Sequence, residues 1–171
     1  RQGADLVMFS GDKLFGSLQS GIIAGDKKMI QSIKESPLFR TYRCSPLTLF
    51  ELQETTSKYV SKKEIEIPLW KMISMKYENL ENRIKSVCEN LEIKHEVVHD
   101  YSVMGGGTLP NKSIASPVIQ ISELENKDLM SKLMRNDIPI IPRTNKNNII
   151  IDLRSTSEKN DIYIKDFFTN L

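Results

Sequence analysis

The sequence predicts an α+β architecture in two parts, with helices packed against small sheets. Short apolar runs of strand length, such as Leu6–Phe9 and 149–153, alternate with segments of helical periodicity. The clearest helical pattern repeats every three or four residues, at Leu80, Ile84, Val87, Cys88 and Leu91. The composition, 39% hydrophobic and 27% charged, is that of a globular protein.

The first part, residues 1–75, should hold two strands and two helices. We expect strands at 5–9 and 21–24, helices from Asp26 to about Glu35 and from Ser45 to about Val60, a loop at 37–44, and a short apolar segment at 67–73. Ser36-Pro37 ends the first helix because a residue before proline avoids helical backbone. Ser45-Pro46 starts the second, since serine caps a helix and proline suits its first position.

The second part, residues 76–171, should combine helices with a small sheet. We expect helices at 77–91, 126–136 and 159–170, and strands at 93–99 and 117–121. The polar run Asn145–Asn148 separates the apolar runs 138–141 and 149–153, which predicts a β-hairpin.

Charge and composition exclude several classes of protein. Lys+Arg 24 against Asp+Glu 22 leaves a net charge of +2, too balanced to predict nucleic-acid binding alone. Cys44 and Cys88 have no metal-ligand spacing and are expected to be reduced. No apolar run has the length of a membrane span, and no leader is visible, so we expect a cytoplasmic protein without membrane contact. Because Arg1 is followed so soon by a strand, we expect the C-terminal part of a longer chain.

Lys13 is the strongest candidate for chemistry. The apolar run Leu6–Phe9 passes into a polar turn that ends at Lys13, which predicts a lysine at the end of a buried strand. Burial would lower the lysine pKa and favour the nucleophilic amine, with which an aldehyde cofactor such as pyridoxal 5'-phosphate (PLP) forms a Schiff base. The alternative is a solvated loop lysine. Asp12 either tunes Lys13 or caps the following turn.

Arg40 and Arg43 are candidates for anion binding. They lie three residues apart, and on a helical turn they would project to the same side. Two guanidinium groups close together suit phosphate-like oxygens. The alternative is a pair of solvated arginines.

Three further motifs are weaker. The run Gly105–Gly107 could hold a phosphate, but three glycines are more typical of an unusual backbone path. His95 and His99 lie on an alternating strand without a third ligand nearby, so we expect no metal site. The lysines at 27, 28 and within 58–76 are expected on solvated faces, and some could contact nucleic-acid phosphates.

The segment around Lys13 resembles that of a known family. Ser10-Gly11-Asp12-Lys13, followed by Gly16-Ser17-Leu18-Gln19-Ser20-Gly21, is similar to the cofactor-lysine segment of bacterial L-seryl-tRNA(Sec) selenium transferases, the selenocysteine synthases. That family has Gly-Pro-Gln-Ala-Gly in the second segment, so Leu18 replaces a proline and Ser17 a glycine. Gly105–Pro110 and the stretch from Pro142-Arg143 to Thr156 continue the similarity in the same order, with Pro142 in place of a glycine.

The resemblance implies an α/β PLP-dependent transferase of fold type I. Residues 1–75 would be the end of its PLP-binding large domain, and residues 76–171 its α+β C-terminal small domain. PLP on Lys13 would convert seryl-tRNA(Sec) to selenocysteinyl-tRNA(Sec) through a PLP-bound aminoacrylyl intermediate, with Asp12 as a second catalytic residue. Arg40 and Arg43 would hold selenophosphate, the selenium donor.

The resemblance also implies an assembly, a ring-shaped homodecamer built from dimers. It places the acidic partner of the PLP ring nitrogen and the main tRNA-binding domain upstream of Arg1, so that the 171 residues alone would be inactive.

Two other functions stay open at this point. A related fold-type-I PLP lyase, such as an amino-sugar phosphate ammonia-lyase, would keep the lysine but would not act on tRNA. A non-catalytic oligomerisation or binding module would require no reaction at Lys13. The Ser-Gly-Asp-Lys motif and the paired arginines favour the transferase over the lyase.

Overall fold

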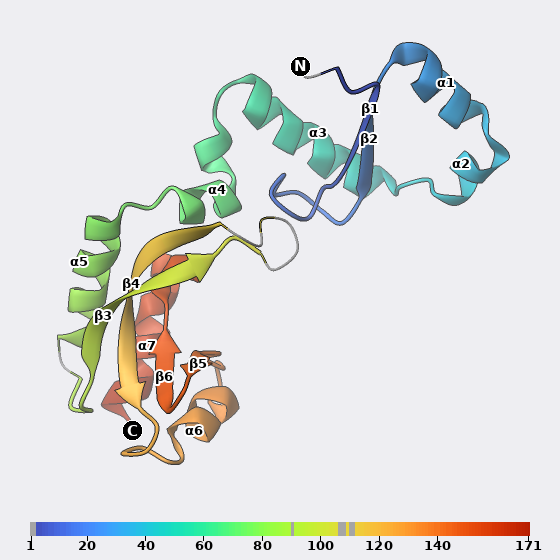
Figure 1. The fold of residues 1–171 in the computed structure, drawn as a ribbon. Coiled ribbons are helices and arrows are strands. Elements are labelled where there is room, and N and C mark those ends of the chain that lie inside the picture. Colours follow the sequence, from blue (N-terminus) through green and yellow to red (C-terminus); the bar gives the residue numbers. More distant parts are fainter. Residues whose placement is uncertain (1–2, 90, 106–108, 110–111) are drawn as a thin grey trace. The chain divides into compact units, whose positions relative to one another are not determined.

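The computed structural model describes residues 3–89, 91–105, 109 and 112–171 (Figure 1). The chain forms two compact units, Arg1–Lys71 and Met72–Leu171. The assignment of its two parts to the large and small domains of a PLP enzyme stays a prediction. No helix of the described residues is long and apolar enough to cross a membrane.

The first unit is a β-hairpin accompanied by helices. Its elements are β1 (Leu6–Ser10), β2 (Gly21–Gly25), α1 (Lys27–Glu35), α2 (Pro37–Thr41), α3 (Pro46–Val60), a 3-10 helix (Glu64–Glu66) and α4 (Pro68–Ile73), which ends just beyond the unit. The two strands pair antiparallel, from Leu6 opposite Gly25 to Ser10 opposite Gly21. The Asp26 carboxylate accepts the first free N–H groups of α1, and the Ser45 hydroxyl does the same for α3, as their sequence positions predict.

The predicted loop at 37–44 is partly wrong, because its first half forms helix α2. Pro37 occupies the first helical position, and Ser36 before it has extended backbone. The same Ser36-Pro37 pair therefore ends one helix and starts the next, and only the first effect was predicted.

The second unit is a four-stranded antiparallel sheet with helices. Its strands are β3 (Glu96–Val103), β4 (Ser113–Ser122), β5 (Arg143–Asn145) and β6 (Asn148–Ile151), in the order β3-β4-β6-β5, and its helices are α5 (Tyr77–Cys88), α6 (Leu129–Arg135) and α7 (Asp161–Thr169). Isoleucines of β4 and β6 pack with apolar side chains of all three helices in one core. Short 3-10 helices lie at Leu153–Ser155 and Glu158–Asn160.

One predicted strand of this unit lies elsewhere in the sequence, and another extends further than predicted. The hairpin around Asn145–Asn148 is confirmed, but its first strand is Arg143–Asn145 and not the apolar run 138–141. Strand β3 runs to Val103, beyond the predicted end at residue 99, because β4 starts early enough to pair with all of it. Apolar content alone located neither the first strand of the hairpin nor the end of β3, because pairing with a neighbouring strand determines where a strand lies.

Candidate active site

The hairpin β1–β2 presents Lys13 on a closed turn of residues 11–20, which we call the lysine turn. Three backbone hydrogen bonds shape it: the Gly11 N–H donates to the Ser20 carbonyl over 2.9 Å, the Ser17 N–H to the Gly11 carbonyl over 2.8 Å, and the Gly16 N–H to the Lys13 carbonyl over 2.9 Å. The turn is therefore held by backbone bonds although Ser17 and Leu18 replace the glycine and proline of the family pattern.

Gly16 is the position of the turn where the backbone conformation favours glycine. Its φ is +75°, in the left-handed region that side chains disfavour. A Cβ atom there would also lie 2.6 Å from the Ile67 Cγ2 atom, which belongs to a buried side chain. Close packing of Ile67 under the turn therefore excludes any larger residue at Gly16.

Lys13 and Asp12 form an ion pair at the tip of this turn. The Lys13 Nζ donates to the Asp12 Oδ2 over 2.9 Å. This bond, more than the charge of the ammonium at longer range, holds the pKa of Asp12 below its ordinary value. Of the two roles predicted for Asp12, the contact favours organisation of the lysine, because the carboxylate bonds Nζ.

The prediction that Lys13 follows a buried strand is wrong for this chain. Val7, Met8 and Phe9 of β1 are 50%, 76% and 41% exposed, and the Lys13 side chain is 57% exposed. The described side chains therefore leave the Lys13 amine accessible.

The residues present fit the attachment of PLP through an imine. An aldehyde needs access to a primary amine, and the exposed Nζ of Lys13 provides it. Asp12 is the one ionic partner of that amine among the described residues, so no second contact blocks it. Lys13 is thus the residue that would hold the cofactor.

Arg40 and Arg43 lie in and just after α2. Arg40 belongs to the last turn of the helix, and the Arg43 N–H donates to the Arg40 carbonyl over 3.4 Å. Both residues are exposed, and neither guanidinium has a hydrogen-bonded or ionic partner within the described part of the chain. Two unpaired cations three residues apart can bind one anion.

A groove connects the arginine segment with the hairpin. Its cavity volume is about 740 Å³. Its lining includes Ser10 and Gly21 at the base of the lysine turn, and Phe39 and Tyr42 beside the arginines. The groove is therefore lined by residues that flank the lysine turn and by residues that flank the two arginines.

The motif near the C-terminus forms a polar network within the second unit. Asp152 accepts hydrogen bonds from the Ser102 and Ser116 hydroxyls and from the Arg154 N–H, and it pairs with Arg143 over 3.2 Å. The buried Arg154 guanidinium donates to the carbonyls of Met72, Ile73, Met75 and Ala115. Burial lowers the pKa of Arg154, and the charge of Asp152 opposes that shift.

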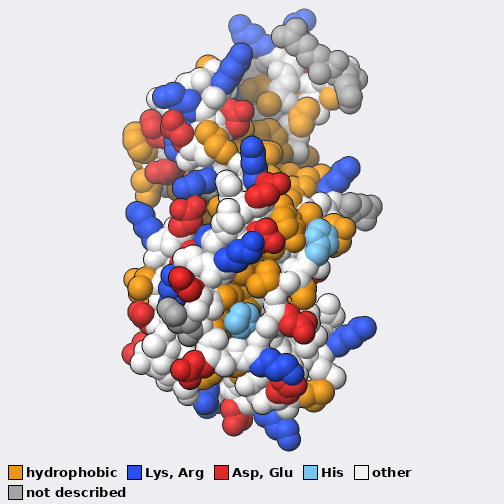
Figure 2. Space-filling view, turned by 90° about the vertical axis from the view of Figure 1, so that its left-hand side faces the viewer, with side chains coloured by type: hydrophobic (Ala, Val, Ile, Leu, Met, Phe, Trp, Pro, Cys, Tyr) orange, Lys and Arg blue, Asp and Glu red, His pale blue; other side chains and the backbone are white. Residues whose placement is uncertain are grey.

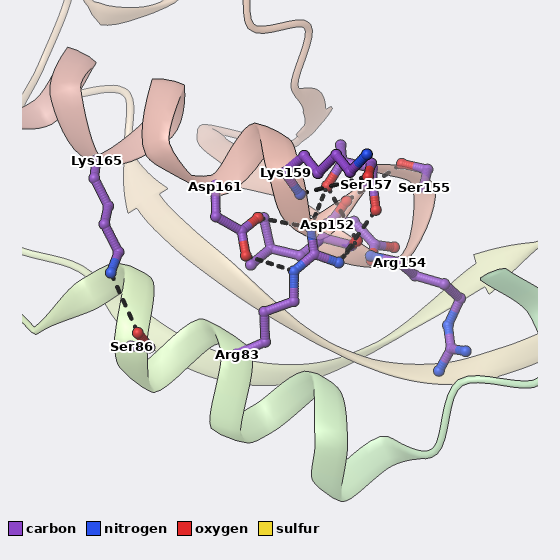
Figure 3. Close-up of polar contacts among 11 residues, drawn as sticks. Arg83, Ser86, Asp152, Arg154, Ser155, Ser157, Lys159, Asp161 and Lys165 are labelled. Carbon is purple, nitrogen blue, oxygen red and sulfur yellow. Dashed lines mark hydrogen bonds and ion pairs between the residues drawn. The ribbon is translucent and has the colours of Figure 1, made fainter. Parts of the chain in front are cut away.

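Arg83 of α5 joins this network to α7 (Figure 3). Its guanidinium forms two hydrogen bonds with the Asp161 carboxylate, over 2.7 and 2.6 Å, and a third with the Leu153 carbonyl. These contacts fix helices to the sheet, so the geometry indicates a structural role for the segment 152–156.

The remaining motifs contribute no described site. Gly106 and Gly107 of the predicted glycine run lie outside the described residues. The His99 ring stacks on Tyr77 and meets Tyr101 edge-on, and a ring nitrogen of His95 bonds the Ile93 carbonyl. Within the described ranges, no group of three His, Cys, Asp or Glu side chains could hold a metal ion.

Comparison with known sequences decides the family. The family model for L-seryl-tRNA selenium transferase (SelA) matches residues 1–157. The chain belongs to the L-seryl-tRNA selenium transferase family. The resemblance inferred from the lysine and C-terminal motifs is thereby confirmed.

Individual members of the selenium transferase family support this assignment. A protein of Aliarcobacter butzleri named L-seryl-tRNA(Sec) selenium transferase is 39% identical over 97% of this chain and 37% of its own length. Proteins of the same name from Campylobacter lari and Alkaliphilus oremlandii are 37% and 35% identical over 91% and 96% of the chain. The chain thus spans between 34% and 38% of the length of these relatives.

A solved structure shares the fold. The structure of D-glucosaminate-6-phosphate ammonia-lyase matches 96% of this chain and 42% of its own, with a TM-score of 0.62 and 19% identity. At that identity the likeness concerns fold alone. It agrees with the predicted fold class at the level of the whole chain.

The sequence did not indicate two residues that support the lysine turn through hydrogen bonds. Tyr59 lies in the helix predicted from Ser45 to about Val60, and Trp70 in the apolar segment predicted at 67–73, yet both carry hydrogen bonds next to the lysine turn. Aromatic side chains with a polar atom usually bond it when partly buried, so their type was the available signal. Nothing in the sequence indicated which carbonyl they would reach.

Proposed function

We propose that this chain carries the cofactor lysine of an L-seryl-tRNA(Sec) selenium transferase, an enzyme that converts seryl-tRNA(Sec) to selenocysteinyl-tRNA(Sec). The observation that carries the proposal is the accessible Lys13 amine, paired with Asp12 at the tip of a closed turn. Family membership supports the substrate. Because the chain spans 37% of its Aliarcobacter relative, we propose the activity for a protein completed to that length.

Each of the named residues has a part in the proposed reaction. Lys13 would hold PLP in the resting enzyme, and PLP would supply an electron sink for negative charge at the seryl α-carbon. The Lys13 Nζ, when free, accepts the α-proton and returns a proton to the departing hydroxyl. Asp12 holds the Lys13 ammonium by its ion pair and so orients it. Arg40 and Arg43 neutralise the charge of selenophosphate as selenium is delivered.

The proposal includes a setting for the enzyme. We place it in the cytoplasm, where aminoacyl-tRNA is available, as a homo-oligomeric ring of dimers with seryl-tRNA(Sec) and selenophosphate as its substrates. The family assignment supports the tRNA substrate, and the ring rests on the resemblance alone.

An ammonia-lyase is the second candidate function, and the likeness that suggests it concerns fold alone. The fold neighbour is a D-glucosaminate-6-phosphate ammonia-lyase. Its 19% identity is far below the 39% of the selenium transferase relative, so the transferase is the better supported function.

Borohydride reduction tests the proposed function. In the completed protein loaded with PLP, reduction and peptide mapping should place the pyridoxyl group on Lys13, and Lys13→Ala should abolish this label. Lys34→Ala, on the exposed surface of α1, serves as the matched control and should leave the label in place. A pyridoxyl group on any other lysine of the unmodified protein would overturn the assignment.

A further inference from the structure

The Tyr59 hydroxyl of α3 is hydrogen-bonded to the backbone directly after Lys13. It donates to the Phe15 carbonyl over 2.9 Å and lies 3.3 Å from the Leu14 carbonyl. The Trp70 indole N–H donates in turn to the Tyr59 hydroxyl. A phenol has one hydrogen to donate, so the shorter bond to Phe15 is the principal one, and the donor from Trp70 strengthens it by polarisation.

Aromatic contacts add to these hydrogen bonds in holding the turn. The Phe15 ring stacks on the Tyr59 ring, with centroids 5.1 Å apart and planes inclined by 23°. The Phe15 ring also lies 5.7 Å, between centroids, from the ring of Phe9 in β1. The residue two positions after Lys13 is therefore fixed through its side chain and its carbonyl together.

We propose that Tyr59 is the positioning residue of the cofactor lysine, an inference that rests on the proposed function. Lys13 is exposed, and Asp12, its neighbour in the chain, lies on the same turn. Packing around the lysine side chain therefore cannot fix where Nζ points, and the backbone of the turn must do so. Tyr59 connects that backbone to the 15-residue helix α3, with Trp70 of α4 behind it.

Tyr59→Phe isolates the hydroxyl, since the ring that stacks on Phe15 is kept. Without the bond to Phe15, we expect the Gly16 and Ser17 amides of the completed protein to exchange hydrogen about tenfold faster, because one lost hydrogen bond opens the turn more often. Tyr163→Phe, the same chemical change in α7, is the matched control and should leave both rates unchanged. Unchanged rates in Tyr59→Phe would overturn the proposal.

A second variant and a second measurement separate positioning from folding. If Tyr59→Phe lowers the helix content measured by circular dichroism, Trp70→Phe is the variant to test instead. It keeps the Tyr59 phenol and removes the indole N–H that donates to the phenol oxygen. In the completed protein, Tyr59→Phe should raise the PLP dissociation constant about tenfold, with the residual pyridoxyl label still on Lys13. Faster exchange with unchanged PLP affinity would overturn the positioning role.

The two proposals fail in different ways. If borohydride labelling of the unmodified protein misses Lys13, the proposed function is wrong, while amide exchange still decides whether Tyr59 holds the turn. If the label lies on Lys13 and exchange does not respond to Tyr59→Phe, the proposed function stands and the role of Tyr59 is wrong.

Discussion

Single residues of this chain carry different kinds of constraint. Lys13 is a candidate cofactor lysine because of its position on a turn and not because of burial, since its side chain is 57% exposed. Arg154 is the opposite case, a cation that is 5% exposed and whose two terminal guanidinium nitrogens donate to backbone carbonyls. Arg40 and Arg43 have no such partners within the described residues, so their charges are available to a ligand.

Removal of either arginine should affect use of the selenium donor alone. A lost charge-assisted hydrogen bond costs about 1.5–3 kcal/mol, or roughly a tenfold to hundredfold loss at limiting selenophosphate. In the completed protein, Arg40→Ala and Arg43→Ala should bind PLP and seryl-tRNA(Sec) normally, and excess donor should partly restore selenium transfer. Arg135→Ala, an exposed position on α6, is the control. If both variants transfer selenium at the wild-type rate with limiting selenophosphate, the arginines do not bind the donor and are a solvated pair.

Cys88 should make stability fall at alkaline pH. Burial raises the pKa of its thiol from 9.0 to about 11. A raised folded-state pKa contributes stability below pH 9.0, and this contribution is lost as the pH rises toward about 11. Because the thiol is half-buried, we expect an effect below about 1.4 kcal/mol.

Urea denaturation at a series of pH values measures this effect. Between pH 9.0 and about 11, the free energy of unfolding should fall less in Cys88→Ala than in the unmodified chain. Cys44→Ala should reproduce the unmodified slope. Equal slopes for Cys88→Ala and the unmodified chain would contradict the burial of this thiol.

At the scale of elements, helices were easier to predict than strands. The caps at Asp26 and Ser45 and the apolar spacing of 77–91 located three helices to within a few residues, because these signals are local. Strand β5 was missed because Arg143–Asn145 contains no apolar residue and exists by pairing with β6. The ion pair of Lys13 lay within reach of sequence, but the contacts of Tyr59, 44 and 45 residues from its partners, did not.

The polar network of Arg154 should be the strongest connection between elements of the second unit. Arg154→Met removes the donor to four carbonyls and leaves Asp152 without a charge that it faces, at a cost of about 3–5 kcal/mol in the free energy of unfolding. Arg135→Met, on the exposed face of α6, should change stability by less than about 0.5 kcal/mol. Urea denaturation followed by circular dichroism compares the two variants, and equal midpoints would refute the structural role.

At the scale of the whole molecule, the two units differ in their cores. Among the described residues of the first unit, Ile67 is the one buried apolar side chain, whereas the continuous core belongs entirely to the second unit. Figure 2 shows charged side chains of both signs mixed over one face, with hydrophobic side chains exposed between them. This mixture agrees with the net charge of +2 and shows no single-sign patch on that face.

The second unit should therefore fold alone, and the first should not. Residues 72–171 contain the whole core and the Arg154 network, so we expect a cooperative unfolding transition worth about 5 kcal/mol. Residues 1–71 should give the narrow amide spectrum of an unfolded chain. Nuclear magnetic resonance spectra of the two pieces provide the measurement. A dispersed spectrum for residues 1–71 would show that the hairpin and its helices are self-sufficient.

The bond between Trp70 and Tyr59 gives this protein an optical reporter of its own. Trp70 is the sole tryptophan among the 171 residues, and its indole N–H ends on the hydroxyl that holds the lysine turn. Tryptophan fluorescence therefore reports on the surroundings of the lysine turn, because the second unit contains no tryptophan. A shift of the emission maximum would follow every opening of that turn, without any label added to the chain.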